Sequence, residues 1–182
     1  MSSDYHFLTE WRVAGTVDEV RAVLGNGPEL PRWWPAVYLS VDEVTRGGPD
    51  SLDAVVDVHT KGWFPYTLRW RLHVTEPITN AGFALEASGD LEGTGRWTFA
   101  QDGPEVVITY EWRVHASKPL LRRLSWLLKP AFAANHRWAM RTGEESLRLE
   151  LRRRRLGPPA SESVPPPPPA TFRFLRGGNR RD

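Results

Sequence analysis

Strict alternation of apolar and polar residues, in two stretches of the chain, constrains its fold more than any other feature. In residues 66–75 every second position is apolar, namely Tyr66, Leu68, Trp70, Leu72 and Val74. Residues 106–115 repeat the pattern with Val106, Ile108, Tyr110, Trp112 and Val114. Because successive side chains of a strand point to opposite faces, both stretches predict strands with one buried face. This pattern is typical of antiparallel sheets with one face in water.

Shorter runs of the same kind predict five more strands, over residues 4–14, 37–46, 52–60, 81–90 and 93–101. In the first, we expect Tyr5, Phe7, Trp11 and Val13 to face inward. In residues 52–60 the expected inward residues are Leu52, Ala54, Val56 and Val58. Turn-forming Gly, Pro, Asn and Asp residues separate the runs, so the strands should be joined by hairpins.

Two short helices are predicted between the first two strands. Thr16 and Glu19 have the spacing of a capping box, which indicates a helix that continues to about Leu24. The glycines at 25 and 27 should end it, and a second short helix or turn should cover residues 28–34 and end at Pro35.

A long helix is predicted after the last strand, within residues 120–155. Pro130 would remove a backbone donor inside it, so we expect a shorter helix to end near Leu128 and the main helix to open at Pro130. Three- and four-residue spacing then defines one apolar face, made of Phe132, His136, Ala139 or Met140, Gly143, Leu147 and Leu151.

The chain divides at residue 156 into a predicted domain, 1–156, and a predicted disordered tail, 157–182. Five consecutive prolines at 165–169 should form a semi-rigid polyproline II spacer. Residues 148–182 contain nine arginines and three acidic residues, a charge of +6. Since the whole chain carries +2, residues 1–147 carry −4. A folded nucleic-acid binder should have a basic body, so we expect no nucleic-acid partner.

Composition excludes several other classes. The chain has no cysteine, and therefore no disulfide, thiolate metal site or cysteine nucleophile. No stretch has the pattern of a signal peptide or the length of a membrane span, so we expect a cytoplasmic protein without integral membrane association. The histidines at 6, 59, 73 and 115 fall on polar strand faces, so no metal site is predicted. Common catalytic and nucleotide-binding motifs are absent, and no cofactor is expected.

The order of strand, two short helices, six strands and a long helix is the helix-grip plan. In this α+β fold a curved antiparallel seven-stranded sheet wraps around the C-terminal helix. Three segments also resemble bacterial proteins of the START-like (SRPBCC) superfamily, often labelled polyketide cyclase/dehydrase-like: Gly89–Phe99, the Trp33–Trp34 pair before Pro35, and Asn135–Leu147. The resemblance covers roughly residues 4–155. It implies a pocket between sheet and helix, with Trp33 and Trp34 near its entrance.

The inward residues give a candidate binding site. We expect the ligand to be contacted by Trp11, Trp33, Trp34, Val56, Tyr66, Trp70, Phe83, Trp97, Tyr110, Trp112, Phe132, His136 and Met140. His136 is of most interest because it is a titratable group on the apolar helix face. The alternative reading is a core-edge histidine bonded to a tyrosine or a carbonyl. Gly143, on the same face, suggests that a strand or a ligand approaches the helix backbone closely.

Three functions remain open. The first, which we favour, is binding of a small hydrophobic molecule: a lipid, polyketide, quinone or aromatic metabolite. The second is a polyketide aromatase/cyclase in which His136 or a tyrosine such as Tyr110 assists proton transfer. The third assigns the function to the Pro-rich tail, which would dock a partner with an SH3-like groove or an anionic surface.

Overall fold

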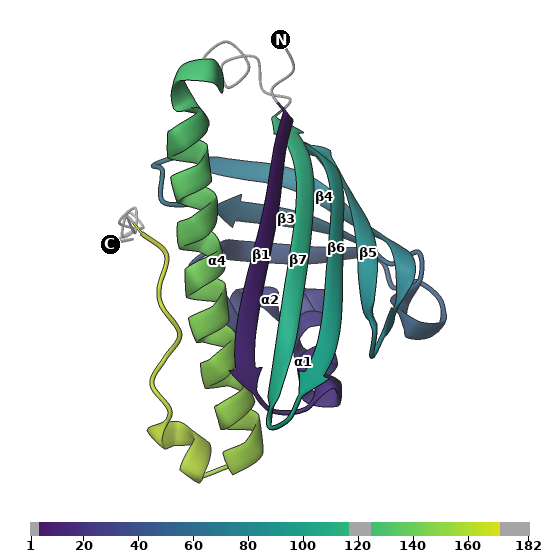
Figure 1. Cartoon of the computed structure of the whole chain (residues 1–182), viewed down its shortest axis with the longest axis vertical. Coiled ribbons are helices and arrows are strands. Elements are labelled where there is room, and N and C mark those ends of the chain that lie inside the picture. Colours follow the sequence, from purple (N-terminus) through teal and green to yellow (C-terminus); the bar gives the residue numbers. More distant parts are fainter. Residues whose placement is uncertain (1–3, 117–124, 172–182) are drawn as a thin grey trace, which may run out of the picture.

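The computed structural model describes residues 4–116 and 125–171. Within them, seven strands form one antiparallel sheet in the order β1-β7-β6-β5-β4-β3-β2 (Figure 1). The strands are β1 (Asp4–Ala14), β2 (Tyr38–Thr45), β3 (Val55–Lys61), β4 (Thr67–Thr79), β5 (Gly82–Gly89), β6 (Leu91–Asp102) and β7 (Glu105–Ala116). All of the predicted strands are present.

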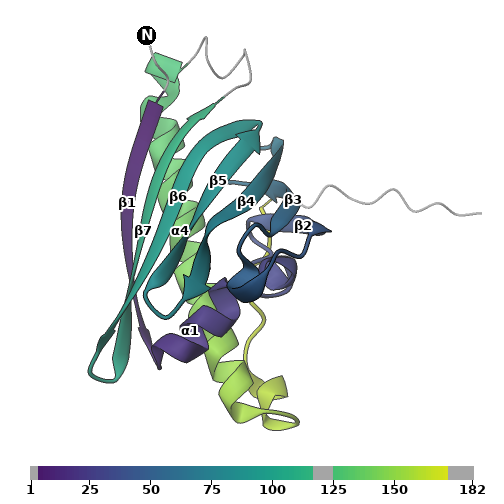
Figure 2. The same cartoon turned by 90° about the vertical axis from the view of Figure 1, so that its right-hand side faces the viewer.

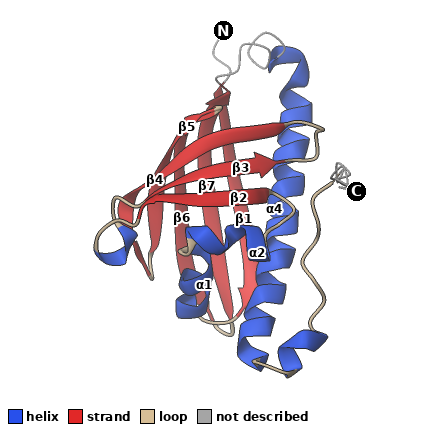
Figure 3. Ribbon diagram, turned by 180° about the vertical axis from the view of Figure 1, so that it is seen from behind, coloured by secondary structure: helices blue, strands red, loops and turns tan. Residues whose placement is uncertain are grey.

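The sheet curves around one long helix, α4 (Ser125–Leu156). In Figure 1, β1 and β7 run along α4, whereas β3 and β4 run across its direction; Figure 3 shows β2 beside β3. Figure 2 shows the curvature from the side. Two short helices, α1 (Val17–Leu24) and α2 (Leu30–Trp33), lie below β2 at one end of the sheet (Figure 3). The 3₁₀ helix η1 (Gly27–Glu29) joins them. This arrangement is the predicted helix-grip fold.

The start of α1 follows the predicted capping box. The Thr16 hydroxyl accepts a bond from the Glu19 amide, and the Glu19 carboxylate accepts one from the Thr16 amide at 2.8 Å. Arg155, near the end of α4, bonds the same carboxylate at 2.6 Å. The first helix is therefore tied to the last.

The start of β3 differs from the prediction. Residues 52–54 precede the strand, and Leu52 is 36% exposed, so its predicted inward position is wrong. The cause is a tight turn, in which Asp50, Ser51 and Asp53 have φ of 50°, 57° and 63°. This left-handed conformation breaks the alternation on which the prediction rested. Ala54 is half-buried but also lies outside the strand.

The start of α4 also differs. The helix begins at Ser125 and contains Pro130, so the predicted break near Leu128 and the opening at Pro130 are wrong. Pro130 stands in the second turn, where the helix loses one backbone bond and continues. The predicted buried face is confirmed for Met140, Gly143, Leu147 and Leu151.

The outer face of the sheet carries charged pairs. Arg71 bonds Asp57 at 2.7 Å, and Arg96 forms an ion pair with Glu76. These side chains are about half exposed, so each pair adds little to stability.

Residues 157–171 fold back beside α4 and are called the C-terminal strap here (Figures 1 and 3). A 3₁₀ helix, η3 (Ala160–Ser163), opens the return, and Val164 after it is only 6% exposed. Arg153 of α4 donates to the Pro165 carbonyl at 3.0 Å. The sequence predicted disorder from residue 157, but the strap has defined contacts because an isolated apolar side chain finds a buried position. Residues 172–182 of the predicted tail lie outside the described residues.

No helix among the described residues combines the length and the apolar character needed to span a membrane.

Candidate functional site

An inner cavity of about 180 Å³ lies between the sheet and the first half of α4. Most of the predicted ligand-contacting residues surround it. They are Trp34, Tyr66, Trp70, Trp97, Tyr110, Trp112, Phe132, His136 and Met140. The structure thus brings together side chains from the end of α2, the β3–β4 loop, three strands and α4.

An outer cavity of about 440 Å³ adjoins it, between the α1–α2 segment and strands β2 to β5. Of the predicted residues, Val56 and Phe83 lie here and not in the inner cavity. Five side chains line both spaces and so form the wall between them: Trp34, Tyr38, Leu72, Leu85 and Trp97.

Trp11 and Trp33 line neither cavity. Both are packed in the core, with exposed fractions of 2% and 0%. The ring of Trp11 lies 5.6 Å from that of Trp34 and 5.4 Å from that of Trp97, so it supports the shared wall from behind. Trp34 was expected near the pocket entrance, but it lies deep, between the two cavities.

One side of the inner cavity is a continuous aromatic surface. The rings of Trp97 and Tyr110 are stacked at 4.0 Å, and those of Tyr110 and Trp112 at 5.8 Å. Trp70 follows at 5.8 Å from Trp112. These residues come from β6, β7 and β4, and the register pairs Trp97 directly with Tyr110. Such a surface favours flat apolar molecules that stack on it.

His136 contributes a neutral polar group. Its ring stacks on Phe7 at 4.1 Å, and its Nε2 shares a hydrogen bond of 3.3 Å with the Thr9 hydroxyl. Burial, helped by the positive charge of Arg137, lowers the pKa of His136 to about 4. The imidazole is therefore unprotonated at neutral pH. The sequence left open a histidine bonded to a tyrosine or to a carbonyl, but the observed partner is the Thr9 hydroxyl.

The cavity tyrosines also stay neutral. Burial, and then the nearby Tyr5, raise the pKa of Tyr66 to about 12. Burial also raises the pKa of Tyr38 and that of Tyr110. At neutral pH these phenols are hydrogen-bond donors and acceptors without charge.

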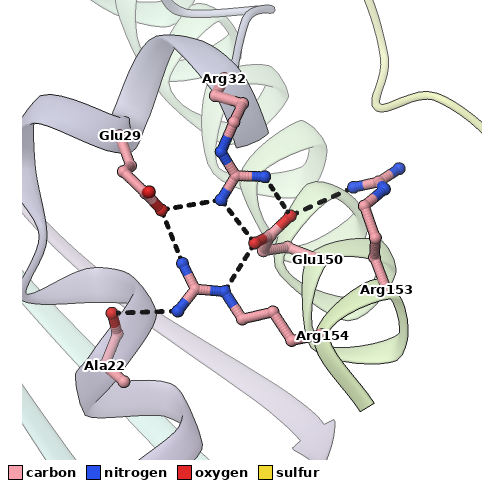
Figure 4. A network of polar contacts seen from close by, with 6 residues as sticks. All are labelled: Ala22, Glu29, Arg32, Glu150, Arg153 and Arg154. Atoms are coloured by element: carbon pink, nitrogen blue, oxygen red, sulfur yellow. Dashed lines mark hydrogen bonds and ion pairs between the residues drawn. The ribbon is translucent and has the colours of Figure 1, made fainter. Parts of the chain in front are cut away.

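Helices α2 and α4 are held together by a network of ion pairs outside the inner cavity (Figure 4). Glu150 of α4 is 1% exposed and bonds Arg32 of α2 at 2.7 Å, Arg154 at 2.6 Å and Arg153 at 3.1 Å. Glu29 bridges Arg32 and Arg154 from the other side. Burial would raise the pKa of Glu150, but bonds from Arg32 and Arg154 outweigh it and lower that pKa. The network fixes α2, and with it Trp34, against α4.

A match of most of the chain to one protein-family model identifies the family. Residues 6–152 match the family model described as polyketide cyclase/dehydrase and lipid transport. The chain belongs to this family. No curated protein matches the chain in sequence.

Several solved structures have the same fold as this protein. TTHA0849 from Thermus thermophilus has a TM-score of 0.64 at 16% identity, covering 79% of this chain and 97% of that one. The Zhui aromatase/cyclase from a Streptomyces species, R1128, has a TM-score of 0.63 at 16% identity, covering 83% and 95%. A START superfamily protein from Mycobacterium smegmatis has a TM-score of 0.55 at 15% identity, covering 74% of this chain and 97% of that one. At such identities the likeness shows the fold alone.

The sequence pattern did not mark two polar residues, Thr60 and Lys61, at the cavity of this polyketide cyclase/dehydrase family protein. Thr60 of β3 accepts a bond of 2.8 Å from the indole N–H of Trp70. Asn135, which the sequence placed beside His136, accepts a bond of 2.6 Å from the Trp63 amide and so ties the β3–β4 loop to α4. Thr60 shares the face of Val56 and Val58, which was an available signal. Lys61 also lines the inner cavity, but it interrupts the alternation, so the sequence pattern gave no signal for it.

Metal chemistry has no support among the described residues, where no cluster of three or more His, Asp or Glu side chains could hold an ion. Three of the histidines instead pair singly with carboxylates: His6 with Glu111, His73 with Asp53 and His115 with Glu92.

Proposed function

We propose that this protein binds a small, flat, largely apolar molecule in the inner cavity, with one end extending toward the outer cavity. The observation that carries the proposal is the stacked aromatic wall of Trp97, Tyr110 and Trp112 facing a helix side that offers neutral polar groups. Preformed apolar cavities with a few oriented polar groups are the usual form of small-molecule sites.

The energetics agree with this proposal. Contact with the wall removes apolar ligand surface from water, at about 25 cal/mol for each Å². Tyr66, Tyr110 and His136 can orient oxygen substituents through hydrogen bonds. Those polar groups remain unsatisfied if a ligand lacks matching atoms, which gives selectivity as well as affinity. Polyketides, quinones and aromatic metabolites fit this description better than single-chain lipids, because they are flat and oxygenated.

The second candidate is an aromatase/cyclase, and the family description favours it. In that reaction a cavity folds a poly-ketone, and acid and base groups move protons during ring closure. A group suited to this has a pKa near the working pH. With a pKa of about 4, His136 can accept a hydrogen bond at neutral pH but is a weak base. The raised tyrosine pKa values leave phenols that donate hydrogen bonds. These shifts favour binding over catalysis.

The test is native mass spectrometry of the purified protein, with extraction of any co-purifying molecule. A cavity-filling variant, Ala139→Trp, should abolish binding because Ala139 lines the inner cavity. The matched control is Glu145→Trp, on the exposed side of the same helix. Binding that survives in Ala139→Trp would overturn the proposal. A ring-closed or dehydrated product, formed from an added poly-ketone thioester, would establish the cyclase instead.

A further inference from the structure

We propose that the bound molecule carries an aliphatic chain on its flat aromatic or quinonoid ring, with the ring in the inner cavity and the chain in the outer one. The inference rests on the proposed function, because the ring occupies the same site. It gives the outer cavity a part of the ligand to hold, and so it narrows the class of ligand.

The two cavities differ in the chemistry of their linings. Apart from the five shared side chains, the inner cavity is lined largely by aromatic rings, which include Phe7, Trp70, Tyr110 and Trp112. Apart from the same five, Phe83 is the single aromatic residue among the described residues that line the outer cavity. Aliphatic side chains dominate there, and they include Leu24, Leu30, Val56, Val74 and Ile78. Rings stack on flat molecules, whereas aliphatic contacts have no preferred direction and suit a flexible chain.

Strand β4 leads from one cavity to the other. Along its inward face, Leu68 and Trp70 line the inner cavity only. Leu72 lines both cavities, and Val74 lines the outer cavity only. Each strand residue rises about 3.3 Å, so Trp70 and Val74 lie about 13 Å apart along the strand. This face of β4 is therefore a continuous floor, along which one extended molecule can contact both cavities.

The rim of the outer cavity favours a neutral chain. Two arginines and two acidic residues of this rim pair with each other, Arg21 with Asp50 at 3.8 Å and Arg46 with Glu43 at 3.4 Å. All four side chains are exposed by 39% or more. The rim thus has no net charge and meets water. The far end of the chain should lie here, with the ring as the inner and oriented part of the ligand.

The test compares 2-naphthol with 6-hexyl-2-naphthol, which adds only the chain, by isothermal titration calorimetry on the full-length protein. Each methylene group that is buried raises the affinity about fourfold. Since part of the chain should stay near the rim, we expect the hexyl compound to bind the wild type at least about thirtyfold more tightly than 2-naphthol.

Filling the outer cavity should remove this gain. Val56→Trp should reduce it about tenfold or more, because Val56 lines only the outer cavity and lies opposite Leu72 in the strand register. Ala54→Phe fills the same cavity from the turn before β3 and should act in the same direction. Both variants should still bind 2-naphthol, which also shows that they are folded. The matched control is Val44→Trp, since Val44 is 50% exposed and lines neither cavity, and it should keep the full gain.

The outcomes separate this inference from the proposed function. A gain in the wild type below about fourfold, the effect of one methylene group, overturns the inference, and binding of 2-naphthol then leaves the proposed function intact. An equal gain in the wild type, Val56→Trp and Ala54→Phe also overturns the inference, because the chain then lies outside the outer cavity. Binding of neither compound to the wild type overturns both.

Discussion

Gly143 of α4 lies directly against the indole ring of Trp34. A Cβ built on Gly143 would stand 2.3 Å from Cζ2 and 2.6 Å from Cε2 of that ring. The sequence predicted a close approach to the helix backbone at this glycine, by a strand or a ligand. The approaching group is instead a tryptophan from the end of α2, which fills the wall between the two cavities. A glycine that costs helix stability thus gives Trp34 its place.

Gly143→Ala should therefore destabilise the protein, although alanine is the better helix former. Overpacking of this kind costs about 1–3 kcal/mol of unfolding free energy. Urea denaturation measures the change. Glu145→Ala, on the exposed side of α4, is the control and should change stability by less than about 0.5 kcal/mol. A Gly143→Ala protein more stable than wild type would show that Trp34 can move without cost.

Glu150→Gln should be strongly destabilising. The substitution keeps the shape of the side chain but leaves Arg32, Arg153 and Arg154 without the buried negative charge that they surround. Breaking a buried ion pair costs about 3 kcal/mol or more. The control is Glu43→Gln, since the Glu43–Arg46 pair is exposed and should contribute less than about 1 kcal/mol. Equal effects in urea denaturation would mean that the network is not a structural tie.

Stability should fall in acid partly through Glu19. Bonds from Arg155, together with those from Thr16, overcome burial and lower the pKa of Glu19 from 4.5 to about 2. A lowered carboxyl pKa contributes stability above pH 4.5 that is lost as the pH falls toward 2. Glu19→Gln should flatten this part of the profile of unfolding free energy against pH. Asp18→Asn removes the same charge from the same turn without touching Arg155, and it should retain the slope.

His136 should remain neutral until about pH 4. The unfolded chain takes up this proton near pH 6.5, so the folded state loses stability as the pH falls from 6.5 to about 4. The histidine ring signals in an NMR titration give the pKa directly. His136→Gln should reduce the loss of stability in this window. A midpoint near 6.5 for His136 would mean that the ring is well hydrated, and it would reopen the possibility of acid–base catalysis.

Val164→Asp should release the strap without unfolding the domain. Burying a valine is worth about 1.5–3 kcal/mol, so its loss should raise the open population of the strap more than about tenfold. Limited proteolysis should then cut within residues 160–171 much faster than in wild type. Val164→Ile keeps the apolar contact and is the control. Unchanged cleavage of Val164→Asp would show that the remaining contacts suffice to hold the strap.

Most of the sheet was predictable because side-chain alternation is local. Trp70 and Trp112 are assigned to the inward face by their own neighbours in sequence, and both line the inner cavity. The inward position predicted for Leu52 was wrong because Asp50 and Ser51, in the turn before it, adopt a left-handed conformation. Such a conformation usually calls for glycine, and no glycine stands at these positions to signal it.

The missing parts of the site depend on long-range contacts. Lys61 is covered partly by a strap that comes more than a hundred residues later, so no local pattern marks it. Glu150 lies among arginines in sequence, where a charged helix face in solvent is the ordinary expectation. Its burial depends on Arg32, which approaches from another helix. Val164 is a single apolar residue in a segment of polar residues and prolines, so no periodic pattern marks it as buried.

The shared wall gives the protein its own optical probe. Among the described residues, Trp34 and Trp97 face both cavities and Trp70 and Trp112 face the inner one, so four tryptophans lie where a ligand would sit. A molecule that enters the inner cavity must change the emission of these indoles, whereas the buried rings of Trp11 and Trp33 provide a constant background. Occupancy of the cavity can therefore be followed in unlabelled protein, by intrinsic fluorescence.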